Sequence, residues 1–194
     1  MKMPCSAIPF LLLSLLFAGT AGAAPTMQLV WAATSGSGAI GSDTIVAKTG
    51  DFLVLDMYLL ADCEGIFAAS ASLVWDPNVL IGLQAEECPS PTNPIFGACE
   101  DSGGKIMQPS QLGVDLSPGA AVGFDVWSLG TPGGLGGFYC ETMHLGRMDF
   151  IVGNQGNSTV EVAYPEGSGV VIDGGLVEHS PPATAYIKQP MGCF

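Results

Sequence analysis

The chain has 194 residues, of which 18 are acidic and five are basic, so its formal net charge at pH 7 is −13. So acidic a chain argues against nucleic acid and against anionic membrane surfaces as partners, because both attract basic patches. The length is enough for one domain with a substantial hydrophobic core.

The first 24 residues have the pattern of an export signal. Lys2 supplies a positive start, residues 10–17 (FLLLSLLF) are apolar, and residues 21–23 (AGA) form a small-residue cleavage site. The apolar stretch is much shorter than the ~20 residues of a membrane-spanning helix. We therefore expect residues 1–24 to be removed and the mature protein to be secreted, periplasmic or on the cell surface, without stable membrane insertion.

Apolar patterns predict β-strands and little helix in the first half of the mature chain. Residues 27–33 form the first predicted strand, and residues 51–60 are apolar on both alternations, as in a strand covered on both faces. Residues 67–75 alternate large apolar side chains with small or polar ones, as a half-buried strand does. This alternation assigns Trp75 to the core.

The second half continues in the same way. Residues 121–127 predict a strand with Val122, Phe124 and Val126 on one face. Residues 145–152 and 159–164 flank a Gly/Asn-rich turn and predict a hairpin whose apolar side chains share one face.

Together with a last strand at residues 169–177, these patterns give about eight or nine strands with turns at sandwich spacing. We therefore predict an all-β protein, an antiparallel β-sandwich over residues 25–178. Residues 86–111 are a Pro- and Cys-rich insertion loop, and residues 179–194 are a Pro-rich C-terminal tail.

Five cysteines remain after removal of the signal, and in an exported chain they predict disulfides. Cys88 with Cys99 is the first predicted pair, since it would close the Pro-rich loop between them. Cys63 with Cys140 is the second. Cys193 is then unpaired, and it is either free or linked to a partner, for example in a disulfide-linked dimer.

The sequence carries no recognisable catalytic constellation. The glycine run of residues 36–41 matches GxGxxG, but no helix is predicted after it, so it is a loop rather than a dinucleotide site. The only histidines are His144 and His179, and no GxSxG motif accompanies them. Cys140 with His144 supplies two zinc ligands where a closed site needs four, so we expect no metal site there.

No cofactor is expected, although oxygen-rich loops leave calcium as an alternative. The loop residues concerned are Glu100, Asp101, Asn154, Asn157 and Asp173.

Two groups of residues are candidates for binding. Trp127 lies on the more polar phase of its strand, where an exposed ring would stack on a glycan. Arg147, Asp149 and Glu161 are expected to form one polar surface cluster across the predicted hairpin, because the two acids would repel without the arginine between them. Ser70 and Ser72 add small polar side chains to the same predicted flat face.

Two stretches resemble cohesin-type domains. The stretch GDFLVLDMYLLADCEGIFAASASLVWDPNVLIGL resembles the opening half, where a Gly-Asp-x-hydrophobic strand, a Gly turn and an alternating strand end on (Tyr/Trp)-Asp-Pro-x-x-Leu. The later MHLGRMDFIVGNQGNSTVEV resembles the penultimate hairpin of that family. The resemblance implies a nine-stranded jelly-roll sandwich, related to carbohydrate-binding modules, whose best-known members hold dockerin modules on one sheet face.

We therefore expect an exported, stand-alone cohesin-like module that catalyses nothing and binds a protein partner or a polysaccharide. One alternative is a secreted hydrolase with paired carboxylates, as in glycosidases. Another is a cell-surface structural or assembly protein linked through Cys193.

Overall fold

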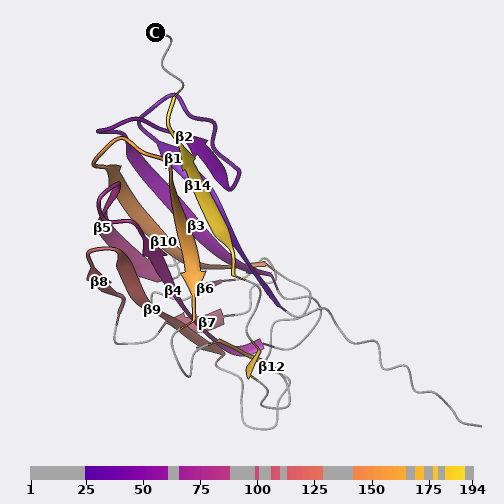
Figure 1. Cartoon of the computed structure of the whole chain (residues 1–194). Coiled ribbons are helices and arrows are strands. Elements are labelled where there is room, and N and C mark those ends of the chain that lie inside the picture. Colours follow the sequence, from indigo (N-terminus) through magenta and orange to yellow (C-terminus); the bar gives the residue numbers. More distant parts are fainter. Residues whose placement is uncertain are drawn as a thin grey trace, which may run out of the picture.

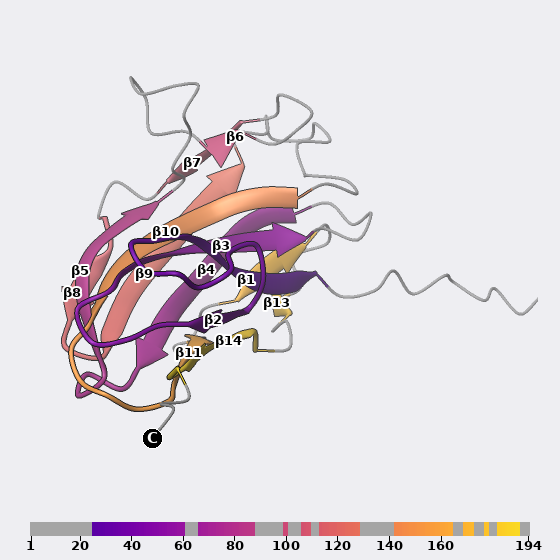
Figure 2. The same ribbon diagram turned by 90° about the horizontal axis from the view of Figure 1, so that it is seen from above.

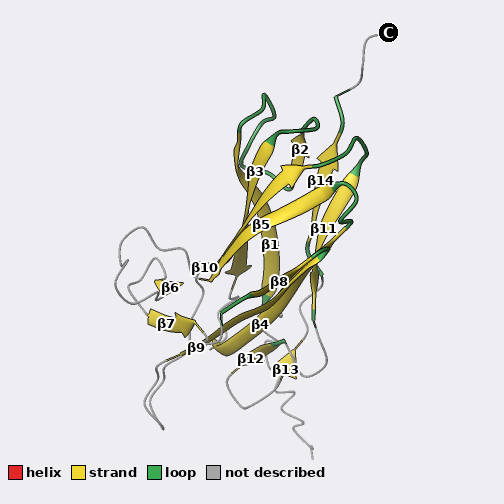
Figure 3. Ribbon diagram, turned by 90° about the vertical axis from the view of Figure 1, so that its left-hand side faces the viewer, coloured by secondary structure: helices red, strands yellow, loops and turns green. Residues whose placement is uncertain are grey.

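The protein is a β-sandwich of two sheets packed face to face (Figures 1 and 2). The computed structural model describes residues 25–60, 66–87, 99–100, 106–109, 113–128, 142–164, 169–172, 177–178 and 182–190. All regular structure in these residues is strand (Figure 3). The predicted fold class is confirmed.

The smaller sheet has four antiparallel strands. Its order is β1 (Thr26–Thr34), β3 (Phe52–Leu60), β10 (Thr142–Val152) and β5 (Leu80–Glu87). The apolar runs predicted at residues 27–33 and 51–60 form the first two of these strands. Burial on both faces of β3 is confirmed from Leu53 to Met57.

The larger sheet has ten strands. Its main path is β2 (Thr44–Val46), β14 (Thr184–Lys188), β11 (Ser158–Ala163), β4 (Ile66–Trp75), β9 (Ala120–Ser128), β7 (Ile106–Pro109) and β6 (Cys99–Glu100). Three short strands join at its sides: β8 (Asp115–Ser117), β12 (Val170–Ile172) and β13 (Val177–Glu178). β6, β7 and β12 lie at the end of the sandwich remote from β2 (Figures 1 and 3).

The hairpin predicted at residues 145–164 is wrong. β10 pairs with β3 and β5 in the smaller sheet, whereas β11 pairs with β14 and β4 in the larger one. The turn between them therefore crosses from one sheet to the other. Phe150 and Val160 both point into the core, but from opposite sheets.

The alternation predicted for residues 121–127 is broken by a bulge. Gly123 has a φ of 95°, and the register of β9 against β4 shifts beside it. Ala121 and Phe124 therefore both face the core, and Val122 points outward, contrary to the prediction. A positive φ of this size strongly favours glycine, so Gly123 is what allows the bulge.

Two predicted loops contain strands of the larger sheet. The insertion at residues 86–111 holds the end of β5 as well as β6 and β7, so it is not a loop throughout. The predicted C-terminal tail contains β14, which is an inner strand that pairs with β11 and, in parallel, with β2. Ala185 and Ile187 of β14 belong to the core, so the sandwich extends beyond Glu178.

The centre of the core is aromatic. The rings of Trp31 and Phe150 meet edge to face with centroids 6.2 Å apart, and those of Trp75 and Phe150 do so at 5.1 Å. Each indole N–H is satisfied, since Trp31 donates to the carbonyl of Asp43 and Trp75 to that of Leu80. The assignment of Trp75 to the core is confirmed, and Trp31 is fully buried as well.

The two sheets pack so closely at Gly146 that no room is left there for a side chain. A Cβ added there would lie 2.4 Å from Cδ1 of Phe124, which projects from the opposite sheet. We expect Gly146→Val to destabilise the protein by about 1 to 3 kcal/mol, because the added atoms must displace a packed ring. Urea unfolding measures the loss. Gln84→Val, at an exposed position, is the control, and a Gly146→Val loss no larger than that of the control would contradict the packing.

Candidate binding surfaces

The predicted polar cluster of Arg147, Asp149 and Glu161 does not exist. Arg147 and Asp149 lie on β10, on the outer face of the smaller sheet, and Glu161 lies on β11, on the outer face of the larger one. Ser70 and Ser72 lie on β4 and belong with Glu161. The error follows from the hairpin prediction, which placed β10 and β11 in one sheet.

An ion pair around a buried carboxylate organises the outer face of the smaller sheet. Asp56 lies in β3, is only 3% exposed, and stands opposite Arg147 of β10. Arg147 donates from Nε to Oδ1 of Asp56 at 2.7 Å and from its terminal nitrogen Nη2 to Oδ2 at 3.0 Å. This two-point contact fixes the guanidinium flat against the sheet.

Two aromatic side chains complete this cluster. The rings of Tyr58 and His144 stack with their centroids 4.7 Å apart, and the hydroxyl of Tyr58 donates to Oδ2 of Asp56 at 3.4 Å. Nε2 of His144 lies 3.1 Å from Oδ1 of Asp56 but outside hydrogen-bond geometry, so the contact is electrostatic. Asp56, Tyr58, His144 and Arg147 are called the Asp56 cluster below.

Electrostatic interactions hold the Asp56 cluster together. Burial alone would raise the pKa of Asp56, but its contacts with His144 and Arg147 outweigh burial and hold that pKa at about 2. Burial and the charge of Asp56 raise the pKa of Tyr58. The hydrogen bonds to Asp56 raise the pKa of Arg147, so the pair is fully ionised at neutral pH.

Asp56, Tyr58 and the partnership of His144 are not among the site residues predicted from the sequence. A signal was present, because Asp56 is the one charged residue in the otherwise apolar run of β3. An acid in the middle of a strand that is covered on both faces requires a partner.

Asp149 lies on the same outer face as Arg147. Burial of Asp149 raises its pKa, although the charge of Arg147 partly offsets this.

The outer face of the larger sheet carries small side chains where β9, β4 and β11 lie next to one another. Val74 of β4 stands between Ala120 of β9 and Glu161 of β11. In the next row, Ser72 stands between Val122 and Ala163. We call this surface the valine face and define it by Val74, Val122, Ser72, Ala120, Ala163 and Glu161.

The valine face exposes apolar side chains between two carboxylates, because Glu161 of β11 stands opposite Val74 and Asp115 of β8 stands opposite Val122. Val122 is 42% exposed and Val74 is 36% exposed, whereas Ser72 is buried between its neighbours and its hydroxyl has no hydrogen-bond partner within the described residues. Ser70 lies further along β4, where its hydroxyl donates to Asp125 at 2.5 Å. Because its side chains are small, this surface is suited to contact with the surface of another protein rather than to enclosing a small ligand.

Several predicted residues lie partly or wholly outside the described residues. The backbone of Trp127 pairs with Ala68 and Gln108 in the larger sheet, but its side chain is outside the described part. The backbone of Cys99 pairs with Met107. Cys63, Cys88, Cys140, Cys193 and His179 are outside, so the predicted disulfides stay predictions.

The described residues contain no group of three or more His, Cys, Asp or Glu side chains that could hold a metal ion. In one loop proposed for calcium, the amide of Asn154 donates to the carbonyl of Asn78, and that of Asn157 accepts from the backbone of Gln189. Asp101 and Asp173, from the other loops, lie outside the described part of the chain. No helix within the same described part is long and apolar enough to cross a membrane.

Known proteins are similar to this chain in fold but not in sequence. No protein-family model matches the chain, and no curated protein matches it. Among solved structures, a cohesin module from a family 33 glycoside hydrolase of Clostridium perfringens superimposes with a TM-score of 0.52 at 9% identity, covering 85% of this chain and 96% of that one. This similarity confirms the cohesin-like fold that was predicted from the sequence.

Two further cohesins are similar at lower TM-scores. The sixth cohesin of scaffoldin B from Acetivibrio cellulolyticus, solved with a Cel5 dockerin, gives 0.49 at 13% identity, covering 86% of this chain and 99% of that one. A non-cellulosomal cohesin from the archaeon Archaeoglobus fulgidus gives 0.46 at 12% identity, covering 84% and 91%.

Proposed function

We propose that the protein is an exported, non-catalytic module that binds a protein partner through the valine face. The observation that carries the proposal is the exposure of Val74 and Val122, which are diagonal neighbours on β4 and β9, next to Glu161. Exposed apolar side chains that adjoin one another mark contact sites on soluble proteins. The cohesin-like fold supports the same function.

Charge indicates the kind of partner. Glu161 borders the exposed valines on one side and Asp115 on the other, and the whole chain carries a net charge of −13. A partner with an apolar centre and a basic rim complements both features, and complementary charge speeds association. We therefore propose a partner whose contact face holds lysine or arginine around aliphatic side chains.

The acids of the predicted polar cluster do not form a glycosidase pair. Asp149 and Glu161 lie on opposite faces of the sandwich, so they do not flank one substrate. Both carboxylate oxygens of Asp56 accept hydrogen bonds from Arg147. These three acids therefore do not supply the paired carboxylates of a glycosidase.

Export is proposed from residues 1–24 and has its own test. We expect N-terminal sequencing of the protein recovered from outside the cytoplasm to begin close to residue 25. A chain recovered only in the cytoplasm with Met1 intact would contradict export, without bearing on the valine face.

Partner capture tests the proposed function. The purified protein is immobilised and exposed to the secreted proteins of its source and to isolated dockerin modules, and any captured protein is then purified and titrated alone. We expect Glu161→Arg and Val122→Arg each to weaken the complex at least tenfold, because each places a positive charge in the contact.

Asp149→Arg is the matched control, because it reverses an acid on the opposite face of the sandwich. Its complex is expected to keep wild-type affinity. Loss of binding with Asp149→Arg and not with Glu161→Arg would contradict the valine face, and failure to find any protein partner would contradict the function.

A further inference from the structure

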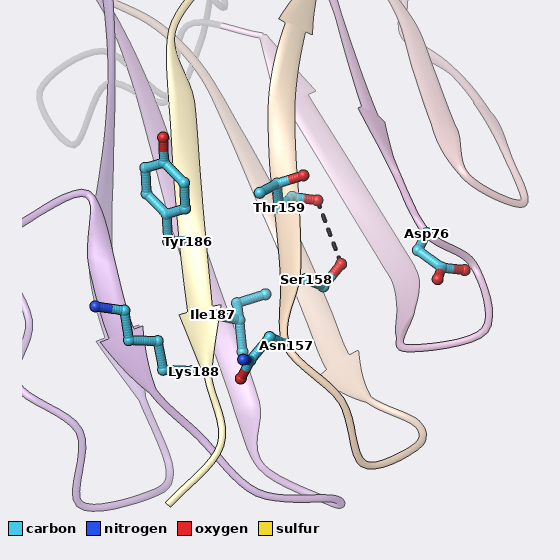
Figure 4. Close-up of a pocket in the computed structure, with 7 residues that line it drawn as sticks. All are labelled: Asp76, Asn157, Ser158, Thr159, Tyr186, Ile187 and Lys188. Atoms are coloured by element: carbon cyan, nitrogen blue, oxygen red, sulfur yellow. Dashed lines mark hydrogen bonds between the residues drawn. The ribbon is translucent and has the colours of Figure 1, made fainter.

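A second surface lies on the outer side of the larger sheet, around Tyr186. An open hollow of about 420 Å³ is present where β11 begins and β14 ends, next to the residue that follows β4. Its lining residues are Asp76, Asn157, Ser158, Thr159, Tyr186, Ile187 and Lys188. Figure 4 shows Tyr186 and Lys188 on β14, Thr159 and Ser158 on β11, and Asp76 beyond β4.

Tyr186 is the aromatic element of this hollow. Its side chain is 44% exposed, although it lies on an inner strand of the sheet. The backbone of β14 is held on both sides, because Tyr186 pairs with Thr159 of β11 and with Thr44 of β2. A rigid strand therefore presents an aromatic side chain to solvent, where it covers no part of the core.

Hydrogen-bond donors and acceptors line the rest of this hollow. Oδ1 of Asp76 accepts two hydrogen bonds from Asn78, but Oδ2 makes none with another described residue. Oδ1 of Asn157 accepts from Gln189, which leaves its amide nitrogen to donate. The ammonium of Lys188 has no hydrogen-bond or ion-pair partner within the described part of the chain and adds a second donor.

These features match the chemistry of a sugar ring. A pyranose has a face of C–H groups that packs on an aromatic ring, and a rim of hydroxyls that each donate and accept hydrogen bonds. The hollow offers an aromatic side chain, a free carboxylate oxygen and two free donors, and its size is within the range of small-ligand sites. We propose that it is a subsite for a neutral glycan.

Charge favours a neutral sugar over an anionic one. Asp76 lines the hollow, Glu161 lies next to it through its hydrogen bond with Thr159, and Lys188 is the one base among the lining residues. The chain as a whole carries a net charge of −13, which repels polyanions. This subsite adjoins the valine face at Glu161, but it is a different site, since it is centred on β14 rather than on β4 and β9.

Affinity electrophoresis of the purified protein tests this subsite. Hydroxyethylcellulose, xylan and galactomannan are the neutral probes, and alginate is the polyanionic comparison. We expect at least one neutral polysaccharide to retard the protein and alginate not to. Tyr186→Ala is expected to weaken that binding about tenfold or more, and Tyr186→Phe, which keeps the ring, is expected to retain most of it.

Tyr58→Ala is the matched control, because it removes a tyrosine from the outer face of the other sheet. It is expected to leave glycan binding unchanged, and circular dichroism confirms that each variant is folded. The subsite is overturned if no neutral probe retards the protein, if Tyr186→Ala binds as the wild type does, or if alginate binds as well as the neutral probes.

Discussion

Phe150→Ala is expected to cost about 3 to 5 kcal/mol of unfolding free energy, one of the two largest effects among the predicted variants. Phe150 is fully buried, and its ring contacts Trp31 in its own sheet and Trp75 in the opposite one. Removal of the ring leaves a cavity where the two sheets meet, and neither indole can move in to fill it without losing its own hydrogen bond. Denaturant unfolding measures the loss.

Two further variants keep this prediction testable if Phe150→Ala does not fold. Phe150→Leu retains most of the volume and is expected to lose about 1 kcal/mol. Ile81→Ala removes an apolar side chain that is 51% exposed, and is expected to lose less than about 0.5 kcal/mol. Equal losses for Phe150→Ala and Ile81→Ala would show that the sheets do not meet at Phe150.

Arg147→Ala is expected to cost about 2 to 3 kcal/mol at neutral pH. Removal of one partner leaves the carboxylate of Asp56 buried and poorly paired, which typically costs about 3 to 5 kcal/mol. The loss is smaller here, because the side chain of Arg147 is 38% exposed and His144 remains beside the carboxylate. The double variant Asp56→Leu with Arg147→Leu removes both charges and is expected to be close to wild type in stability.

Acid unfolding identifies the charge of Asp56 as the cause. The pKa of Asp56 is about 2 in the folded protein against a usual 3.8, so the stability that ionised Asp56 contributes is complete above about pH 4 and is lost as pH falls through 2. Without Arg147 this pKa rises, so the gap between wild type and Arg147→Ala should narrow from pH 4 to pH 2. A gap that stays constant over this range would contradict an electrostatic origin.

The sequence predicts most strands, because burial of one face imposes an alternation that local sequence records. Trp75 and the apolar run of β3 were correctly assigned for this reason. The same alternation does not say which sheet a strand joins. Met148 and Val160 both face inward whether they share a sheet or oppose each other across the core, so the crossing from β10 to β11 could not be predicted.

The candidate surfaces were less predictable, because they depend on that sheet assignment. The crossing separates Asp149 from Glu161 and brings Arg147 to Asp56, which is 91 residues away in sequence. The bulge at Gly123 turns Val122 outward and creates the valine face. Tyr186 was overlooked because β14 is only five residues long, within a Pro-rich segment, although Ala185 and Ile187 alternate with polar neighbours.

Hydrogen exchange on the complex with the captured protein partner shows whether the valine face is the binding surface. We expect the partner to slow exchange of backbone amides in β4, β9 and β11, with little change in β1, β3 and β10. Slowed exchange confined to β3, β10 and β5 would instead place the partner on the Asp56 cluster and contradict the proposal.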